Sequence, residues 1–201
     1  MSQIAEQPEM KDKIIASGIR VGTAVKTKFM IPFITQSNPE GFYLLDLDLT
    51  LNRIQTAGRF IKKFDMSKVI VCSGSNLSKT AIEKFCEITD AKMMFGRFMP
   101  GTLTNPSLPF YSEPQLVIIS DPQIDTQAIT EATNAGIPII GISNTDNITS
   151  KLDLIIPANN RGRQSIATIY WLLAGEIDPS ARSKYQIEDF ETKTVDTEEE
   201  L

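Results

Sequence analysis

Short apolar runs alternate along the chain with longer segments in which apolar residues recur every three or four positions. The runs are typical of buried β-strands, which we expect at residues 42–45, 69–72, 92–95, 115–119, 137–142 and 152–156. The periodic segments are typical of amphipathic helices, which we expect at residues 49–64, 78–88, 126–135 and 164–176. Continuous apolar strands that alternate with helices predict an α/β, three-layer, doubly wound fold with a mostly parallel sheet of about five strands.

One long segment interrupts this alternation. Residues 96–114 contain six prolines and glycines, namely Gly96, Pro100, Gly101, Pro106, Pro109 and Pro114. Such a composition predicts a loop, and a loop of this length in a compact domain is usually functional or disordered.

The acidic residues are concentrated at the end of the chain. Residues 186–201 hold seven acidic residues and one lysine, whereas residues 1–111 hold 14 basic and 10 acidic residues. The formal net charge of −5 therefore belongs to the end of the chain, and the body is nearly neutral with a basic N-terminal half. We expect a flexible tail over residues 1–10, one α/β domain over 11–185, and an acidic, disordered tail over 186–201.

Composition excludes several classes of function. The chain has no histidine, which excludes Ser-His-Asp and Cys-His enzymes and histidine-bound metal centres. Its two cysteines, Cys72 and Cys86, make neither a disulfide framework nor a four-cysteine zinc site. No apolar run approaches the ~20 residues of a membrane span, and no signal peptide opens the chain, so we expect a cytoplasmic protein without a metal or cofactor.

Polar residues follow four of the expected strands, where open parallel sheets bind their ligands. These residues are Asp46–Asp48, Ser73–Asn76, Ser120–Pro122 and Ser143–Asn147. None of them forms a glycine-rich nucleotide motif or pairs a nucleophile with a base. Helix capping by Asp46 and Asp121 and a plain strand-to-helix turn at Ser73–Asn76 are simpler explanations of the first three. For Ser143–Asn147, a ribose or ion site and a hydrogen-bonded turn are equal alternatives. A Rossmann-like enzyme or binding protein for a nucleotide or sugar phosphate, using Ser73–Asn76 and Asn144–Asp146, is the alternative.

Three segments suit contact with a phosphate backbone. Residues 20–28, the loop from residue 96 and residues 159–165 combine arginine or lysine with hydroxyl or amide side chains. Arginine and lysine neutralise phosphates, and hydroxyl and amide groups donate hydrogen bonds to them. Solvated surface charge and helix capping explain the same residues equally well.

At the loop the sequence resembles a known family. Residues Gly96–Asn105 read G-R-F-M-P-G-T-L-T-N, which closely resembles the G-R-F-x-P-G-T-x-T-N signature of the small-subunit ribosomal protein S2 family. Further pairs are similar in order and spacing, among them Glu113–Pro114, Asp121–Pro122, Glu131–Ala132, Ile137–Pro138, Asn159–Asn160 and Trp171–Leu172. The resemblance covers residues 11–176. The coiled-coil insertion of bacterial members is missing, so the resemblance is to the archaeal and eukaryotic branch. The long eukaryotic C-terminal extension is also missing, and the short acidic tail looks archaeal-like.

The resemblance implies a flavodoxin-like three-layer fold and a non-enzymatic, structural role in the small ribosomal subunit. The partners that it implies are small-subunit rRNA and neighbouring ribosomal proteins, with no membrane and no small-molecule substrate. An adaptor that recruits proteins away from the ribosome through its acidic tail and loop is a further alternative.

The family motifs contain the candidate site residues. The implied RNA-binding residues are Lys26, Lys28, Arg97, Asn159, Asn160, Arg161 and Arg163, and the loop motif is represented by Gly96, Pro100, Gly101, Thr102 and Asn105. We expect the charged members to contact rRNA phosphates and the uncharged members to hold loops.

Overall fold

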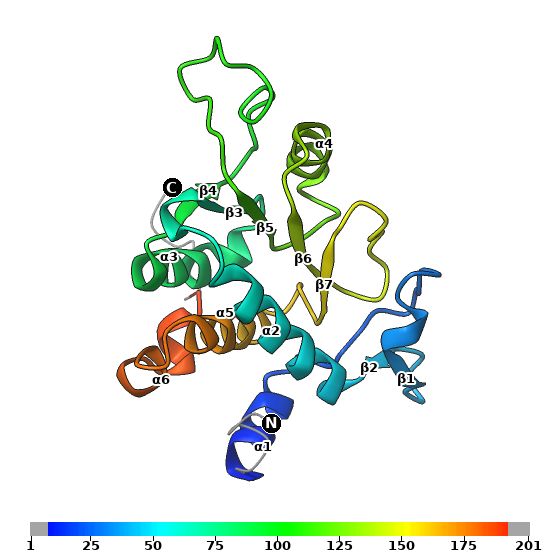
Figure 1. The fold of residues 1–201 in the computed structure, drawn as a ribbon. Helices are drawn as coiled ribbons and strands as arrows, with labels where there is room; N and C mark the ends of the chain where they lie inside the picture. The colour runs from blue at the N-terminus through cyan, green and yellow to red at the C-terminus, as the bar shows by residue number, and fades with distance from the viewer. Residues whose placement is uncertain (1–7, 193–201) are drawn as a thin grey trace, which may run out of the picture.

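The computed structural model describes residues 8–192, and its centre is a five-stranded sheet (Figure 1). The strands are β3 (Val69–Ser73), β4 (Lys92–Phe95), β5 (Leu116–Ile119), β6 (Ile139–Ser143) and β7 (Leu154–Pro157). All neighbours in the sheet are parallel, in the order β4-β3-β5-β6-β7. Counted along these five strands the order is 2-1-3-4-5, the flavodoxin-like order. The expected fold class is confirmed.

Helices cover both faces of the sheet. One face packs against α2 (Leu47–Ile61), α3 (Lys79–Thr89) and α5 (Arg163–Ile177), and the other against α4 (Thr126–Ala135) (Figure 1). Alternate strand residues point to opposite faces, so Val71 and Ile118 join the first core and Ile70 and Val117 join the second. Because every residue of β3, β5 and β6 is buried, these strands show the uninterrupted apolar pattern of a sheet that is covered on both sides.

The connection from β4 to β5 contains no helix or strand, as expected. It crosses the same face of the sheet as α4, where Leu103 is 4% exposed and packs in one cluster with Ala128 and Ile129 of that helix. The loop therefore occupies the position where a crossover helix covers the sheet in a regular α/β unit.

The expectation for residues 42–45 is wrong in one respect. Tyr43–Leu45 (β2) does not join the main sheet but pairs antiparallel with Ile34–Ser37 (β1) in a separate two-stranded sheet. Leu45 is fully buried, in a small cluster with Met30 and Phe33 of the N-terminal segment. A three-residue apolar strand carries no information about its partner, so the hairpin was not predicted.

The ends of the described region are more ordered than expected. Helix α1 (Pro8–Ala16) begins within the expected N-terminal tail, and Ile14 on it is fully buried. After α6 (Ala181–Lys184), a 3₁₀ helix spans Ile187–Phe190, and the Phe190 ring is 1% exposed against the core. The folded region thus extends past the expected boundary at 185, because one aromatic ring anchors the start of the acidic segment. Residues 1–7 and 193–201 lie outside the described region.

Within residues 8–192, no helix combines the length and apolar character needed to cross a bilayer.

Candidate functional site

One carboxylate of helix α4 binds the backbone of the family-like loop. Glu131, on the buried face of α4, is 4% exposed. Its Oε1 accepts hydrogen bonds from the Gly101 N–H (2.7 Å) and the Gln127 amide (2.8 Å), and its Oε2 accepts one from the Leu103 N–H (3.1 Å). Burial alone would raise the pKa of Glu131, but these hydrogen bonds outweigh it and the pKa is lowered. The ionised carboxylate fixes the loop, although sequence reasoning did not single out Glu131 as a site residue.

The uncharged residues of the loop motif have structural roles of their own. Gly101 has a φ of +91°, and a Cβ there would lie 2.6 Å from Leu108 Cδ1. The Thr102 hydroxyl donates to the Met99 carbonyl at 2.6 Å, and Asn105 Oδ1 accepts from the Ser107 N–H at 3.1 Å. Gly96 also has a positive φ, of +86°. These residues shape the loop, whereas Arg97 and Pro100 are exposed to solvent.

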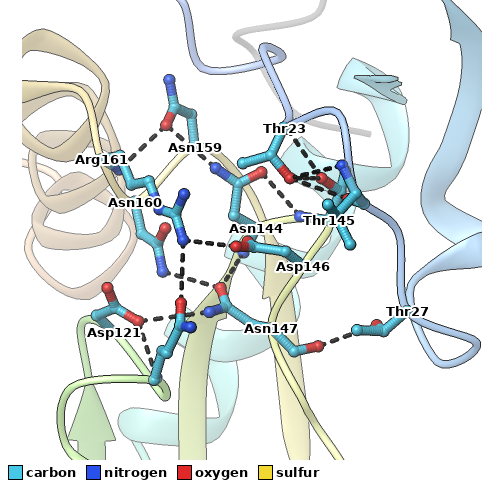
Figure 2. Close-up of polar contacts among 12 residues, drawn as sticks. Thr23, Thr27, Asp121, Asn144, Thr145, Asp146, Asn147, Asn159, Asn160 and Arg161 are labelled. Carbon is cyan, nitrogen blue, oxygen red and sulfur yellow. Dashed lines mark hydrogen bonds and ion pairs between the residues drawn. The ribbon is translucent and has the colours of Figure 1, made fainter. Parts of the chain in front are cut away.

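A second arrangement forms at the carboxyl ends of β6 and β7, where the N-terminal segment lies against two loops (Figure 2). The Thr27 N–H donates to the Thr145 carbonyl at 2.8 Å, and the Thr27 hydroxyl donates to the Asn147 carbonyl at 3.0 Å. The Thr23 N–H donates to the Thr145 hydroxyl at 2.9 Å. The approach is close because Gly22 has no side chain: a Cβ there would lie 2.5 Å from Thr145 Cγ2. Residues more than 115 positions apart in sequence thus form one surface.

Two asparagines hold the neighbouring loops. Asn159 Nδ2 donates to the Gly18 carbonyl at 3.2 Å. Its Oδ1 accepts from the Arg161 N–H at 3.0 Å (Figure 2). Asn160 is 3% exposed, and its Nδ2 donates to Asn147 Oδ1 at 3.0 Å and to the Ile142 carbonyl. The buried Asn160 amide thus links the loop that carries Arg161 to the loop after β6.

The basic residues at this edge differ in their surroundings. Arg161 forms an ion pair with Asp146 and donates to Gln123 Oε1 at 3.0 Å (Figure 2). Arg163, the first residue of α5, is exposed and has no ion pair or hydrogen-bond partner for its side chain within residues 8–192. Lys26 is also exposed, with its Nζ 4.7 Å from the centroid of the Tyr43 ring, and Lys28 is exposed. We call Lys26, Lys28, Arg161 and Arg163 the basic edge.

Arg97 does not belong to the basic edge. It follows β4, and β4 and β7 are the two outer strands of the sheet. Four strand spacings of about 4.8 Å separate the two outer strands. Arg97 lines a cavity with Ile124 and Asp125, which follow β5, whereas the four residues of the basic edge lie on the segments that meet at the carboxyl ends of β6 and β7.

The strand-end residues of the enzyme alternative serve local structure. Ser73 Oγ and Ser78 Oγ are 2.6 Å apart, and Ser75 Oγ accepts from the Leu77 N–H. Asp46 caps α2 by accepting from two backbone N–H groups, as expected. Asp121 does not cap α4; it accepts from the Gln123 N–H, and Asp125 occupies the N-cap position.

No group of three or more histidine, cysteine or acidic residues suitable for a metal ion occurs in residues 8–192.

Comparison with known proteins identifies the family of the chain. A sequence model described as ribosomal protein S2 matches residues 109–178. The chain is 62% identical to small ribosomal subunit protein uS2 of Nitrosopumilus maritimus, over the full length of both chains. It is 54% identical to the protein of the same name from Cenarchaeum symbiosum (94% of this chain, 95% of the relative) and 44% identical to that from Thermofilum pendens (92% and 90%). The chain belongs to the small ribosomal subunit protein uS2 family.

Proposed function

We propose that this protein is a structural constituent of the small ribosomal subunit, where its basic edge docks on rRNA and other surfaces contact neighbouring ribosomal proteins. Relatives that match 100% and 94% of the chain are named as small-subunit proteins, which supports a structural, non-enzymatic role and a place in the cytoplasm with the ribosome. In that role the protein supports subunit assembly and translation.

The observation that carries the proposal is the fixed placement of the basic edge. Backbone and hydroxyl hydrogen bonds from Thr23 and Thr27 hold the lysine segment against the loop after β6. Asn159 and Asn160 hold the arginine segment beside it. Charged groups on a framework that is already ordered lose less conformational entropy when they contact phosphates. Phosphate contacts of this kind fix the position of a protein on a nucleic acid.

Apolar side chains accompany the lysines. Val25, Phe29 and Ile31 are 63%, 52% and 51% exposed, beside Lys26 and Lys28 in the sequence. Exposed apolar groups among basic groups are typical of a surface that a partner covers. The N-terminal segment therefore suits a position between rRNA and another protein of the subunit.

Binding of the purified protein to small-subunit rRNA, measured over a range of salt concentrations, tests the proposal. The double variants Lys26→Ala/Lys28→Ala and Arg161→Ala/Arg163→Ala are each expected to reduce the slope of log K against log salt by about one to two, since roughly 0.7 to 0.9 counterions are released for each phosphate contact. The matched control is Lys62→Ala/Lys63→Ala, two exposed lysines at the end of α2, near the amino ends of the strands. Equal slopes for all three variants would refute docking through the basic edge.

A further inference from the structure

A cavity of about 260 Å³ lies at the carboxyl ends of β3 and β4, beneath the start of the β4–β5 loop. Phe95, Phe98, Phe110 and neighbouring methionines line it, together with Arg97 and Asp125. An adjoining cavity of about 400 Å³ shares Arg97, Phe98 and Asp125. The adjoining cavity lies between the loops that follow β3 and β5, where the strand order reverses, and open α/β sheets bind ligands at such points.

Asp125 contributes a buried carboxylate, one oxygen of which has no hydrogen-bond donor among the described residues. Its side chain is 4% exposed, and the Gly74 N–H donates a hydrogen bond to it. Oδ2 of the same carboxylate is buried and accepts no hydrogen bond from the described residues. A buried acceptor without a donor costs folding free energy. An unpaired buried polar group is uncommon in native proteins and needs an explanation, and a donor from a ligand at this position would supply one.

The other polar groups at the cavity are basic. Arg97 lines both cavities, is exposed, and has no ion pair among residues 8–192. Lys79 lies nearby, with its Nζ 5.7 Å from the centroid of the Phe95 ring. The cavity thus combines an anion-attracting entrance, aromatic walls and an internal acceptor. A protein partner that inserted an arginine or lysine would meet repulsion from Arg97 and Lys79, whereas a nucleotide matches all three features.

We propose that this cavity holds one guanine nucleotide, with its base against the phenylalanine rings, its Watson–Crick edge on Asp125 and its phosphate on Arg97. Guanine presents two adjacent donors, N1–H and the N2 amino group, on that edge. Each of the other three bases presents an acceptor beside its donor, which an ionised carboxylate repels. Proteins read unpaired RNA bases by aromatic stacking and by hydrogen bonds to this edge. With rRNA as the source of the nucleotide, the proposal rests on the function proposed above.

Titration of the purified protein with GMP and AMP, followed by NMR, is the first test. GMP is expected to bind about tenfold or more tightly than AMP, in line with the discrimination that a two-bond contact provides. Asp125→Asn should abolish this preference, while its amide oxygen still accepts from the Gly74 N–H. Arg97→Ala should weaken GMP binding and leave guanosine, which lacks the phosphate, unchanged. Arg59→Ala, an exposed arginine on α2, is the matched control and should change neither. Equal affinity for GMP and AMP would overturn the proposal.

A second test distinguishes rRNA from a free nucleotide as the source. Small subunits that carry wild-type or Asp125→Asn protein are treated with a dicarbonyl reagent that modifies the Watson–Crick edge of guanine. A guanosine of the rRNA that is protected only in wild-type subunits identifies rRNA. A guanine nucleotide released by denaturing wild-type subunits, without a change in rRNA reactivity, identifies a free ligand. Neither signal, in subunits that retain the protein, would overturn this inference and leave the proposed function intact. Absence of the wild-type protein from the subunit would overturn the proposed function itself.

Discussion

The carboxylate of Glu131 accepts a hydrogen bond from the Gly101 N–H at 2.7 Å, and this bond joins α4 to a loop 30 positions earlier in the chain. The same carboxylate also accepts from the Leu103 N–H. One helical side chain thus satisfies two backbone N–H groups of a loop that has no helix of its own to satisfy them. The shape of the family-like loop depends on this anchor.

We expect Glu131→Gln to destabilise the protein by about 1–3 kcal/mol, because the amide cannot accept from both backbone N–H groups and leaves a buried donor unpaired. Denaturant unfolding measures the change. Glu87→Gln removes an exposed ion pair with Lys84 and serves as the control, with an expected effect within ~0.5 kcal/mol. Similar small effects for the two variants would contradict the role of Glu131 as an anchor.

Alanine substitutions at two glycines with positive φ, Gly101 and Gly136, distinguish the cost of backbone strain from the cost of steric crowding. Gly101→Ala should destabilise the protein more than Gly136→Ala, since both positions have a left-handed φ but only the Cβ at 101 meets another side chain. At position 136 no atom lies within 4 Å of the new Cβ, so the expected cost is roughly 1 kcal/mol of backbone strain alone. Thermal unfolding of the two variants checks the order. Equal losses of thermal stability would mean that Leu108 moves away from the new Cβ at position 101 without an energetic cost.

The buried carboxylate of Asp125 predicts a pH dependence of stability. Burial raises the pKa of Asp125 from its usual value to about 6, so the folded state binds a proton more tightly than the unfolded state does. The stability due to this proton is present at low pH and is lost as pH rises from about 4 through about 6.

Asp125→Asn should therefore stabilise the protein at pH 7.5 by on the order of 2 kcal/mol and have little effect at pH 4. Urea unfolding at the two pH values provides the measurement. The opposite order, with the larger gain at pH 4, would show that the ionised carboxylate is paired in the folded protein. If Asp125→Asn gains stability and also loses the preference for guanine, the Asp125 carboxylate is kept for binding although it lowers the stability of the folded protein.

The elements that were predicted correctly are those whose pattern follows from burial alone. β3, β5 and β6 are buried at every residue and appear in the sequence as uninterrupted apolar runs. Helix α4 was expected at its observed bounds because Gly136 ends it in the left-handed conformation. β1 was missed because three of its four residues are exposed and polar, which leaves no apolar alternation to detect.

The candidate site was predictable by residue type but not by arrangement. The sequence identified Asn159, Asn160 and Arg161 as a polar cluster, yet the inward direction of the Asn160 amide depends on Asn147, on a different loop. Glu131 left a weak signal, as an acidic residue between the apolar positions Ile129 and Ala132 of a helix. Asp125 left no signal in the sequence, because its burial depends on the close approach of Gly74, which follows a different strand, β3.

Sedimentation of native lysate on a sucrose gradient, at low and at high salt, tests the central claim most directly. We expect the protein to peak with the small subunit, and the Arg161→Ala/Arg163→Ala variant to leave the subunit at a lower salt concentration than the wild type does. The Lys62→Ala/Lys63→Ala control should leave together with the wild type. A wild-type protein confined to the light fractions at low salt would contradict the account.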